Sequence, residues 1–189
     1  MNEPLSLIMQ AADFAARRHA GQRRKGAAGE PYVNHLLEVA ALLAEATGGN
    51  DAALVAAALL HDTLEDTATE YEELDARFGP EIAAVVAAVT DDKSLPKAER
   101  KRRQIESAPA ASARAKLLKI ADKTSNVRAL VVSPPTNWDV ARVVDYIDWA
   151  EKVVAGCRGR NGMLERAFDA AVTDARAAIA RSAALPART

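Results

Sequence analysis

The segment ALLHDTLEDT, residues 58–67, carries the side chains of this sequence that are best suited to chemistry. A histidine and an aspartate, His61 and Asp62, follow an apolar run directly, and a second acidic pair, Glu65 and Asp66, comes four residues after them. Bare charge is costly to bury in a low-dielectric interior. A neutralising partner is therefore expected where this segment meets the core.

Two further residues also place a histidine or an aspartate beside apolar neighbours. His35 lies early in the helix expected after EPYVNH, and Asp122 lies within LLKIADKTSN, between Leu118 and Asn126 on an inward-facing stripe. Two neutral imidazoles and two carboxylates around one divalent cation would offset both negative charges and use the nitrogen lone pairs. This mixture of nitrogen and oxygen ligands favours Mn²⁺, Fe²⁺ or Zn²⁺ over Ca²⁺ and leaves positions for water and substrate.

Each of these residues also has a plainer interpretation. A lone buried histidine or aspartate is more often a hydrogen-bonded core residue than a ligand, so the adjacent His61 and Asp62 are the stronger signal. Neighbouring helical residues point about 100° apart, and convergence therefore needs a helix end, which a predicted break at 66–69 would supply. Glu65 and Asp66 are placed to deprotonate water or to donate to a leaving oxygen, unless they are helix-end acids in solvent.

The elements that must position these side chains are predicted to be helices. Apolar residues recur at helical spacing almost everywhere, and no segment shows sustained alternation of β-branched residues. Glycine and proline breaks divide the chain into an all-α fold of about nine helices. Asp51 can cap the helix that runs through Leu60, and Ser133, which precedes two prolines, should end a long helix begun near Ala113.

Composition indicates a single globular domain. With 189 residues, 49% of them hydrophobic, the chain can bury a continuous core, and we expect one domain over residues 1–182 and a frayed tail over 183–189. The single cysteine, Cys157, excludes an internal disulfide framework, and we expect a cytoplasmic protein without a membrane segment. A net charge of −1 does not indicate a nucleic-acid polymer as partner.

Five blocks follow one another in order: HAGQRRKGAAGEPYVNH, ALLHDTLEDT, VTDDKSLPKAERKRRQ, KIADKTSNVR and DYIDWAEKVV. Together they resemble the hydrolase domain of the RelA/SpoT family within the HD superfamily, in particular the stand-alone small alarmone hydrolases that are called metazoan SpoT homologues in animals. The resemblance spans nearly the whole chain and implies an all-helical fold. It also implies hydrolysis of the 3′-diphosphate of (p)ppGpp, a small nucleotide, to pyrophosphate and GDP or GTP.

The resemblance further implies roles for individual residues. The family's ligands to one Mn²⁺ correspond to His35, His61, Asp62 and Asp122. The family's catalytic acidic pair corresponds to Glu65 and Asp66. The substrate contacts correspond to Arg24, Lys25 and Asn126 and, by a looser match, to Lys97, Arg142 and Tyr146. Arginine offers a flat stacking face and a bidentate fork, whereas lysine supplies a compact charge for phosphate, so these residue types suit a nucleotide.

The sequence departs from the family pattern in two places and leaves alternatives open. Leu36 stands where a proline usually follows the first histidine, and the turn KGAAGEPY is longer than in the bifunctional enzymes. We expect a chain that degrades alarmone and does not make it. The alternatives are another nucleotide phosphohydrolase, such as an NADPH 2′-phosphatase, and a sensor that binds nucleotide without catalysis. The metal, the oligomeric state and the choice between ppGpp and pppGpp stay open.

Overall fold

The computed structural model describes residues 4–184, which form ten α-helices and one 3₁₀ turn, without a β-strand in that range. The helices are α1 (Pro4–Arg18), α2 (Val33–Ala46), α3 (Ala52–Leu60), α4 (Thr63–Asp66), α5 (Tyr71–Phe78), α6 (Pro80–Ala87), α7 (Lys97–Ser107), α8 (Ala113–Val132), α9 (Val140–Ala155) and α10 (Gly162–Ala184), and the turn η1 spans Ala108–Ala110. The predicted all-α fold is confirmed. Residues 185–189 of the predicted tail lie outside the described residues.

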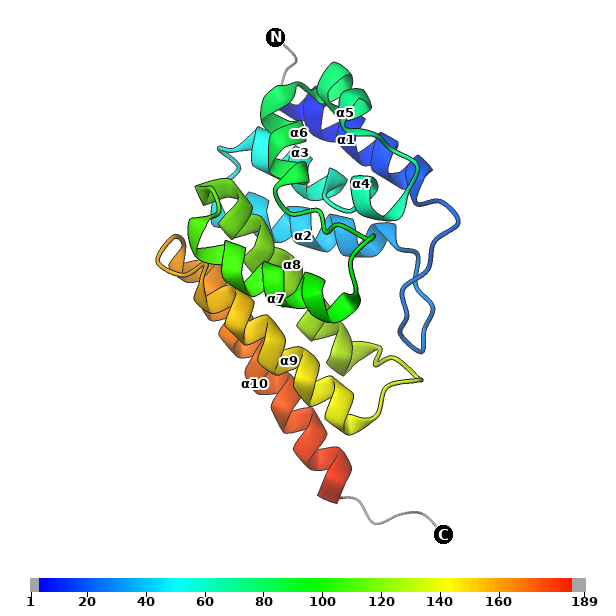
Figure 1. Cartoon of the computed structure of the whole chain (residues 1–189), viewed down its shortest axis with the longest axis vertical. Coiled ribbons are helices and arrows are strands. Elements are labelled where there is room, and N and C mark those ends of the chain that lie inside the picture. Colours follow the sequence, from blue (N-terminus) through cyan, green and yellow to red (C-terminus); the bar gives the residue numbers. More distant parts are fainter. Residues whose placement is uncertain (1–3, 185–189) are drawn as a thin grey trace.

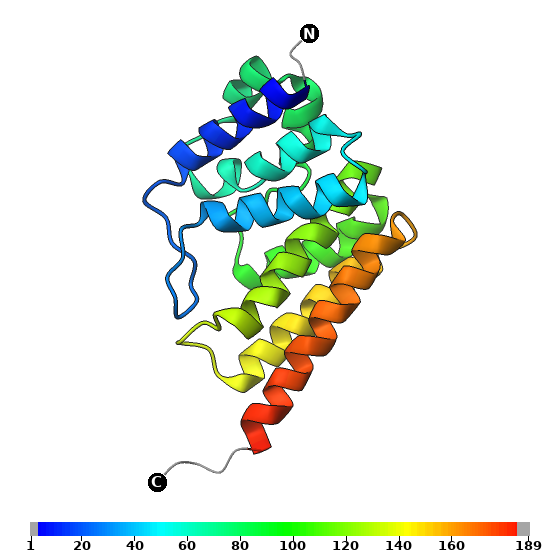
Figure 2. The ribbon, with the colours of Figure 1, turned by 180° about the vertical axis from the view of Figure 1, so that it is seen from behind.

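Helix α3 is the interior helix of the N-terminal half, between α1 and α2 (Figure 2). All of its residues from Leu54 to Leu60 are buried, and small alanines in this run let neighbouring helices approach closely. The predicted cap at Asp51 is confirmed, because its carboxylate accepts a hydrogen bond from the Leu54 N–H at 3.0 Å and from Arg114 Nε at 2.8 Å. This cap fixes where α3 begins.

Helix α8 joins the two halves of the molecule, packing against α2 and α3 on one side and α9 and α10 on the other (Figure 1). It begins at Ala113 after Ser112, whose hydroxyl accepts from the Ala115 N–H, and it ends at Val132 with Ser133 as its C-cap. These limits confirm the predicted long helix. Since half of its residues are buried, α8 is a fixed support for any side chain that it carries.

The loop between α1 and α2 lies beside the link between α8 and α9 (Figure 1). Gly26 and Pro135 form an isolated antiparallel bridge, and the Ala27 N–H donates to the Pro134 carbonyl at 3.1 Å. Gly29 adopts a φ of 56°, which a residue without a side chain tolerates. Among residues 4–184, no helix combines the length and the apolar character needed to cross a membrane.

Candidate metal and nucleotide site

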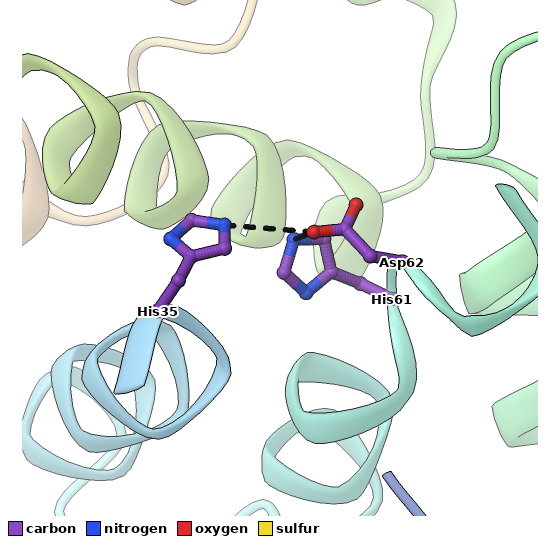
Figure 3. A group of neighbouring side chains, drawn as sticks. All are labelled: His35, His61 and Asp62. Carbon is purple, nitrogen blue, oxygen red and sulfur yellow. Dashed lines mark ion pairs between the residues drawn. The ribbon is translucent and has the colours of Figure 1, made fainter. Parts of the chain in front are cut away.

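Four side chains from three parts of the chain meet in the interior. His35 comes from the first turn of α2, His61 and Asp62 from the link between α3 and α4, and Asp122 from α8. His35 Nε2 lies 3.6 Å from Asp62 Oδ2 and 3.3 Å from Asp122 Oδ1, and His61 Nε2 lies 3.1 and 3.8 Å from the same atoms. Figure 3 shows how the first three point toward one another. The structure thus gathers the four residues expected to hold a metal.

A helix break turns His61 and Asp62 toward one point. Helix α3 ends at Leu60, and the buried Thr63 starts α4 while its hydroxyl donates to the Leu60 carbonyl at 2.6 Å. The break predicted at 66–69 exists, because α4 ends at Asp66, but the break that makes the pair converge lies earlier. This extra break is also why the helix count exceeds nine.

The imidazole of His61 is oriented by the backbone. Its Nδ1 lies 2.8 Å from the carbonyl oxygen of Ala58, which can only accept a hydrogen bond, so we assign the proton to Nδ1. Its Nε2 is buried and has no hydrogen-bond partner among the described residues. This nitrogen is therefore the atom that takes up a proton or a metal ion, and it faces both carboxylates.

The charges of the cluster favour a cation. Burial alone would raise the pKa of the Asp62 carboxyl, but the adjacent His61, whose own pKa the two carboxylates raise despite burial, holds it well below its usual range. Burial is likewise outweighed at Asp122, whose pKa is lowered by Lys123, the donor of a 2.7 Å hydrogen bond, and by the imidazoles. Two anionic carboxylates beside two imidazoles fit a divalent cation that binds nitrogen and oxygen.

The second acidic pair lies beside this cluster on α4. Glu65 accepts a 3.1 Å hydrogen bond from the Asp91 N–H, and burial raises the pKa of the Glu65 carboxyl. Asp66 accepts a hydrogen bond from Lys93. The hydroxyl of Tyr32 donates to Asp62 Oδ2 at 2.7 Å and lies 3.3 Å from Asp66 Oδ2, so it joins the cluster to the acidic pair.

Two of the cavities that border these residues adjoin one another. The smaller, of about 170 Å³, is lined by the four cluster residues together with Glu65 and Asp66. The larger, of about 550 Å³, shares Tyr32, Asp66, Asp91, Gln104 and Asn126 with it. Its further lining is basic and aromatic: Arg23, Arg24, Lys25, Lys97, Arg100, Lys101, Trp138, Tyr146 and Trp149. A nucleotide with several phosphates matches this combination of positive charge and flat apolar faces.

Five of the six predicted substrate residues line the larger cavity, namely Arg24, Lys25, Lys97, Asn126 and Tyr146. The sixth, Arg142, is exposed and is not part of this lining, but its guanidinium lies 4.6 Å from the ring centre of Trp138, which is. Asn126 connects the two cavities, because its amide donates to Asp122 Oδ1 at 2.5 Å and its oxygen accepts from Arg24 at 3.0 Å. The structure therefore places five of the six residues around the larger cavity, and Asn126 also lines the smaller one.

Sequence reasoning missed several residues of these cavities. Trp138 and Trp149, the two tryptophans of the chain, both line the larger cavity, and Lys101 Nζ lies 4.8 Å from the ring centre of Trp149. Tyr32 and Lys123, which contact Asp62 and Asp122, were missed as well. The scarcity of aromatic residues, 4% of the chain, was a usable signal, because rare large rings are often placed at binding sites.

The chain is similar to known proteins over most of its length. The family model described as HD domain matches residues 11–151. The enzyme named guanosine-3′,5′-bis(diphosphate) 3′-pyrophosphohydrolase MESH1 is 49% identical in Xenopus tropicalis, over 89% of this chain and 94% of that protein. The enzyme of the same name from Homo sapiens is 48% identical, with the same coverage of each chain.

A solved structure is similar over nearly the whole length. It belongs to a metazoan ortholog of SpoT that hydrolyses ppGpp, and it superposes with a TM-score of 0.85 at 42% sequence identity, covering 98% of this chain and 100% of that one. A second, from Listeria monocytogenes, gives a TM-score of 0.62 at 28% identity over 77% of this chain. The fold, the family match and these relatives together show that the chain belongs to the HD-domain family, among the metazoan SpoT homologues.

Proposed function

We propose that this chain is a ppGpp 3′-pyrophosphohydrolase, which cleaves (p)ppGpp with water into pyrophosphate and GDP or GTP. The observation that carries the proposal is the cluster of two imidazoles and two carboxylates at the floor of a basic and aromatic cavity. The names of relatives 48–49% identical over most of the chain support the same substrate.

The cluster residues His35, His61, Asp62 and Asp122 would hold one divalent cation, and we propose Mn²⁺. The unpartnered and buried His61 Nε2 and the two anionic carboxylates fit such an ion. When bound there, the cation would supply the positive charge that makes a water molecule acidic and offsets the charge of the phosphoryl group. The protein residues around it carry out the remaining tasks.

Glu65 and Asp66 accept and donate the protons of the reaction. Water attacks the phosphorus bonded to the ribose 3′ oxygen, the bond between these two atoms breaks, and the 3′ oxygen leaves as a hydroxyl. One proton must leave the attacking water and one must reach the 3′ oxygen. Burial raises the pKa of Glu65, which brings this carboxyl nearer to the range where it can accept and return a proton. Lys93 holds Asp66 in position beside it.

The basic residues of the larger cavity hold the nucleotide. Burial and the nearby positive charges of Arg142 and Lys25 lower the pKa of Lys97, so a phosphate bound there would relieve the crowding of like charge. Arg24, tied to Asn126, presents a planar guanidinium for stacking on the base or for pairing with phosphate. Tyr146 and Trp149 add aromatic rings to the lining of the same cavity.

The test is a product analysis of the metal-reconstituted protein. It is incubated separately with ppGpp, NADPH and nucleoside monophosphates, in water enriched in ¹⁸O. We expect turnover of ppGpp, release of intact pyrophosphate, and no ¹⁸O in the guanosine product. Two successive orthophosphates, or label in the guanosine product, would reject the cleavage site, and faster turnover of NADPH would reject the substrate.

We also infer that the catalytic domain extends to residue 182, beyond the family match at residues 11–151. Helix α10 packs along α8, and its Leu164 and Phe168 are fully buried. A chain ending after Ala155 would expose this surface and is expected to aggregate. A cytoplasmic location remains an expectation from the sequence.

A further inference from the structure

A chain of hydrogen bonds runs from the second nitrogen of His35 to the surface. His35 Nδ1 lies 2.9 Å from the Ser125 hydroxyl oxygen, and this hydroxyl donates to Glu38 Oε2 at 2.7 Å. The other oxygen of Glu38 accepts from Arg128 at 3.2 Å. His35 and Glu38 are one turn apart on α2, and Ser125 and Arg128 are one turn apart on α8, so the chain bridges the contact between these helices.

The direction of these hydrogen bonds fixes the proton on His35. A serine hydroxyl has one hydrogen, and an ionised carboxylate can only accept. Because Ser125 gives its hydrogen to Glu38, its oxygen can only accept from His35 Nδ1. His35 must then carry its proton on Nδ1, which leaves the lone pair of Nε2 directed at Asp62 and Asp122.

We propose that Ser125 and Glu38 are positioning residues that hold His35 in this tautomer and orientation, so that Nε2 is ready to bind a cation. The inference rests on the metal centre of the proposed function. Both histidines then carry a proton on Nδ1, because the Ala58 carbonyl accepts from Nδ1 of His61 as Ser125 does from Nδ1 of His35. Partners of this kind commonly fix the ring and raise the basicity of a metal-binding histidine.

The neighbouring Thr124 shows that this arrangement is not the default for a hydroxyl on α8. Thr124 donates to the Ile120 carbonyl four residues earlier, which is the usual partner of a hydroxyl within a helix. Ser125 is equally buried, with 1% of its surface exposed, yet its hydroxyl bonds to residues of α2. The Ser125 hydroxyl thus links the carboxylate of Glu38, whose side chain is 39% exposed, to a histidine that is 3% exposed.

The first arm of the test measures metal affinity, by titration of Mn²⁺ against a competing chelator. Ser125→Ala removes the acceptor for Nδ1–H and should weaken binding by about 10- to 100-fold. Glu38→Gln should weaken it less, because an amide oxygen can still accept from Ser125, whereas Glu38→Ala should approach Ser125→Ala. Thr124→Val is the matched control, since it removes a buried hydroxyl that bonds only its own helix, and its affinity should equal that of the wild type. Equal affinity in Ser125→Ala, or equal loss in Thr124→Val, would overturn the proposal.

The second arm reads the tautomer directly and needs no metal. Nitrogen-15 NMR of the histidine rings in the metal-free wild-type protein should show the His35 proton on Nδ1, and in Ser125→Ala this preference should be lost. An unprotonated Nδ1 on His35 of the wild-type protein would overturn the proposal. A wild-type protein that shows the expected tautomer but binds no metal would instead reject the metal centre, so the two failures are distinguishable.

Discussion

Gly26 lies so close to Ser133 that a methyl group on its Cα would stand 2.2 Å from the Ser133 carbonyl oxygen. The Ala28 N–H adds a 3.0 Å hydrogen bond to the Ser133 hydroxyl. This contact ties the loop that carries Arg24 and Lys25 to the end of α8, the helix that carries Asp122. The distance between the nucleotide loop and the metal cluster is therefore set by a contact that only glycine permits.

Gly26→Ala should displace this loop, because the obstructing atoms include backbone that cannot rotate away. Misplacement of binding groups by about 1 Å can cost up to 10²-fold in rate, so we expect kcat/KM for ppGpp to fall by about 10- to 100-fold, chiefly through KM. Metal content should be unchanged. Gly21→Ala is the control, since a methyl group there meets nothing within 4 Å. A normal KM in Gly26→Ala would contradict the prediction.

Substitutions in the acidic pair and in the metal ligands should differ in their effect on metal binding. Glu65→Gln and Asp66→Asn should bind a near-stoichiometric amount of Mn²⁺ and still bind ppGpp, while turnover falls by about 10²- to 10⁴-fold, as expected for a lost general acid or base. Asp62→Ala should lose the metal, because its carboxylate faces both imidazoles. Metal analysis, ppGpp affinity and turnover are measured on all three variants. Full activity of Glu65→Gln or Asp66→Asn would remove that residue from catalysis.

Metal removal should lower stability as well as activity. A ligand that binds the folded chain alone stabilises it by about 2.7 kcal/mol when its free concentration is a hundred times Kd. For a chain of this size, the stripped protein should melt roughly 5–10 °C lower. Differential scanning calorimetry before and after chelation, followed by return of Mn²⁺, measures the shift. A thermal midpoint that ignores both chelator and Mn²⁺ would count against the metal centre.

The Asp51 cap of α3 should contribute to the free energy of unfolding at neutral pH and lose this contribution at acid pH. Burial alone would raise the pKa of Asp51, but the hydrogen bonds from Arg114 and from the Leu54 N–H lower it below 3.8. A folded-state pKa below the unfolded one stabilises the fold above pH 4, and this contribution disappears as pH falls through the folded value. Asp51→Ala should therefore cost about 1 kcal/mol at pH 7. Urea unfolding from pH 7 to 3 should show this difference shrinking, and a constant difference would contradict the assignment.

Patterns that depend on local chemistry were predictable from the sequence. The cap at Asp51 and the limits of α8 follow from residue types at helix ends, and both are confirmed. The approach of His61 and Asp122 was also predictable, because a polar side chain among apolar residues requires a polar or ionic partner in the interior. These inferences need no knowledge of how distant helices pack.

Features that depend on packing between distant segments were not predictable. No glycine or proline marks the break after Leu60, which is held by a hydrogen bond from the buried Thr63. The position of Arg142 on Trp138 depends on how α9 meets the link before it. The hydrogen bond from Ser125 to Glu38 joins residues of two helices that are remote in sequence, and no spacing rule relates them.

Helix α8 supplies Asp122, so the metal centre is complete only when α8 has packed against the N-terminal helices. His35 and Asp122 are separated by most of the N-terminal half, so their meeting requires closure of a long loop, which is a slow and non-local step. A chain in which only α1, α2 and α3 had packed would hold His35, His61 and Asp62 but would lack the second carboxylate. High-affinity metal binding would then report that α8 has docked, and a metal-titration signal during refolding would time the contact between α8 and the N-terminal helices.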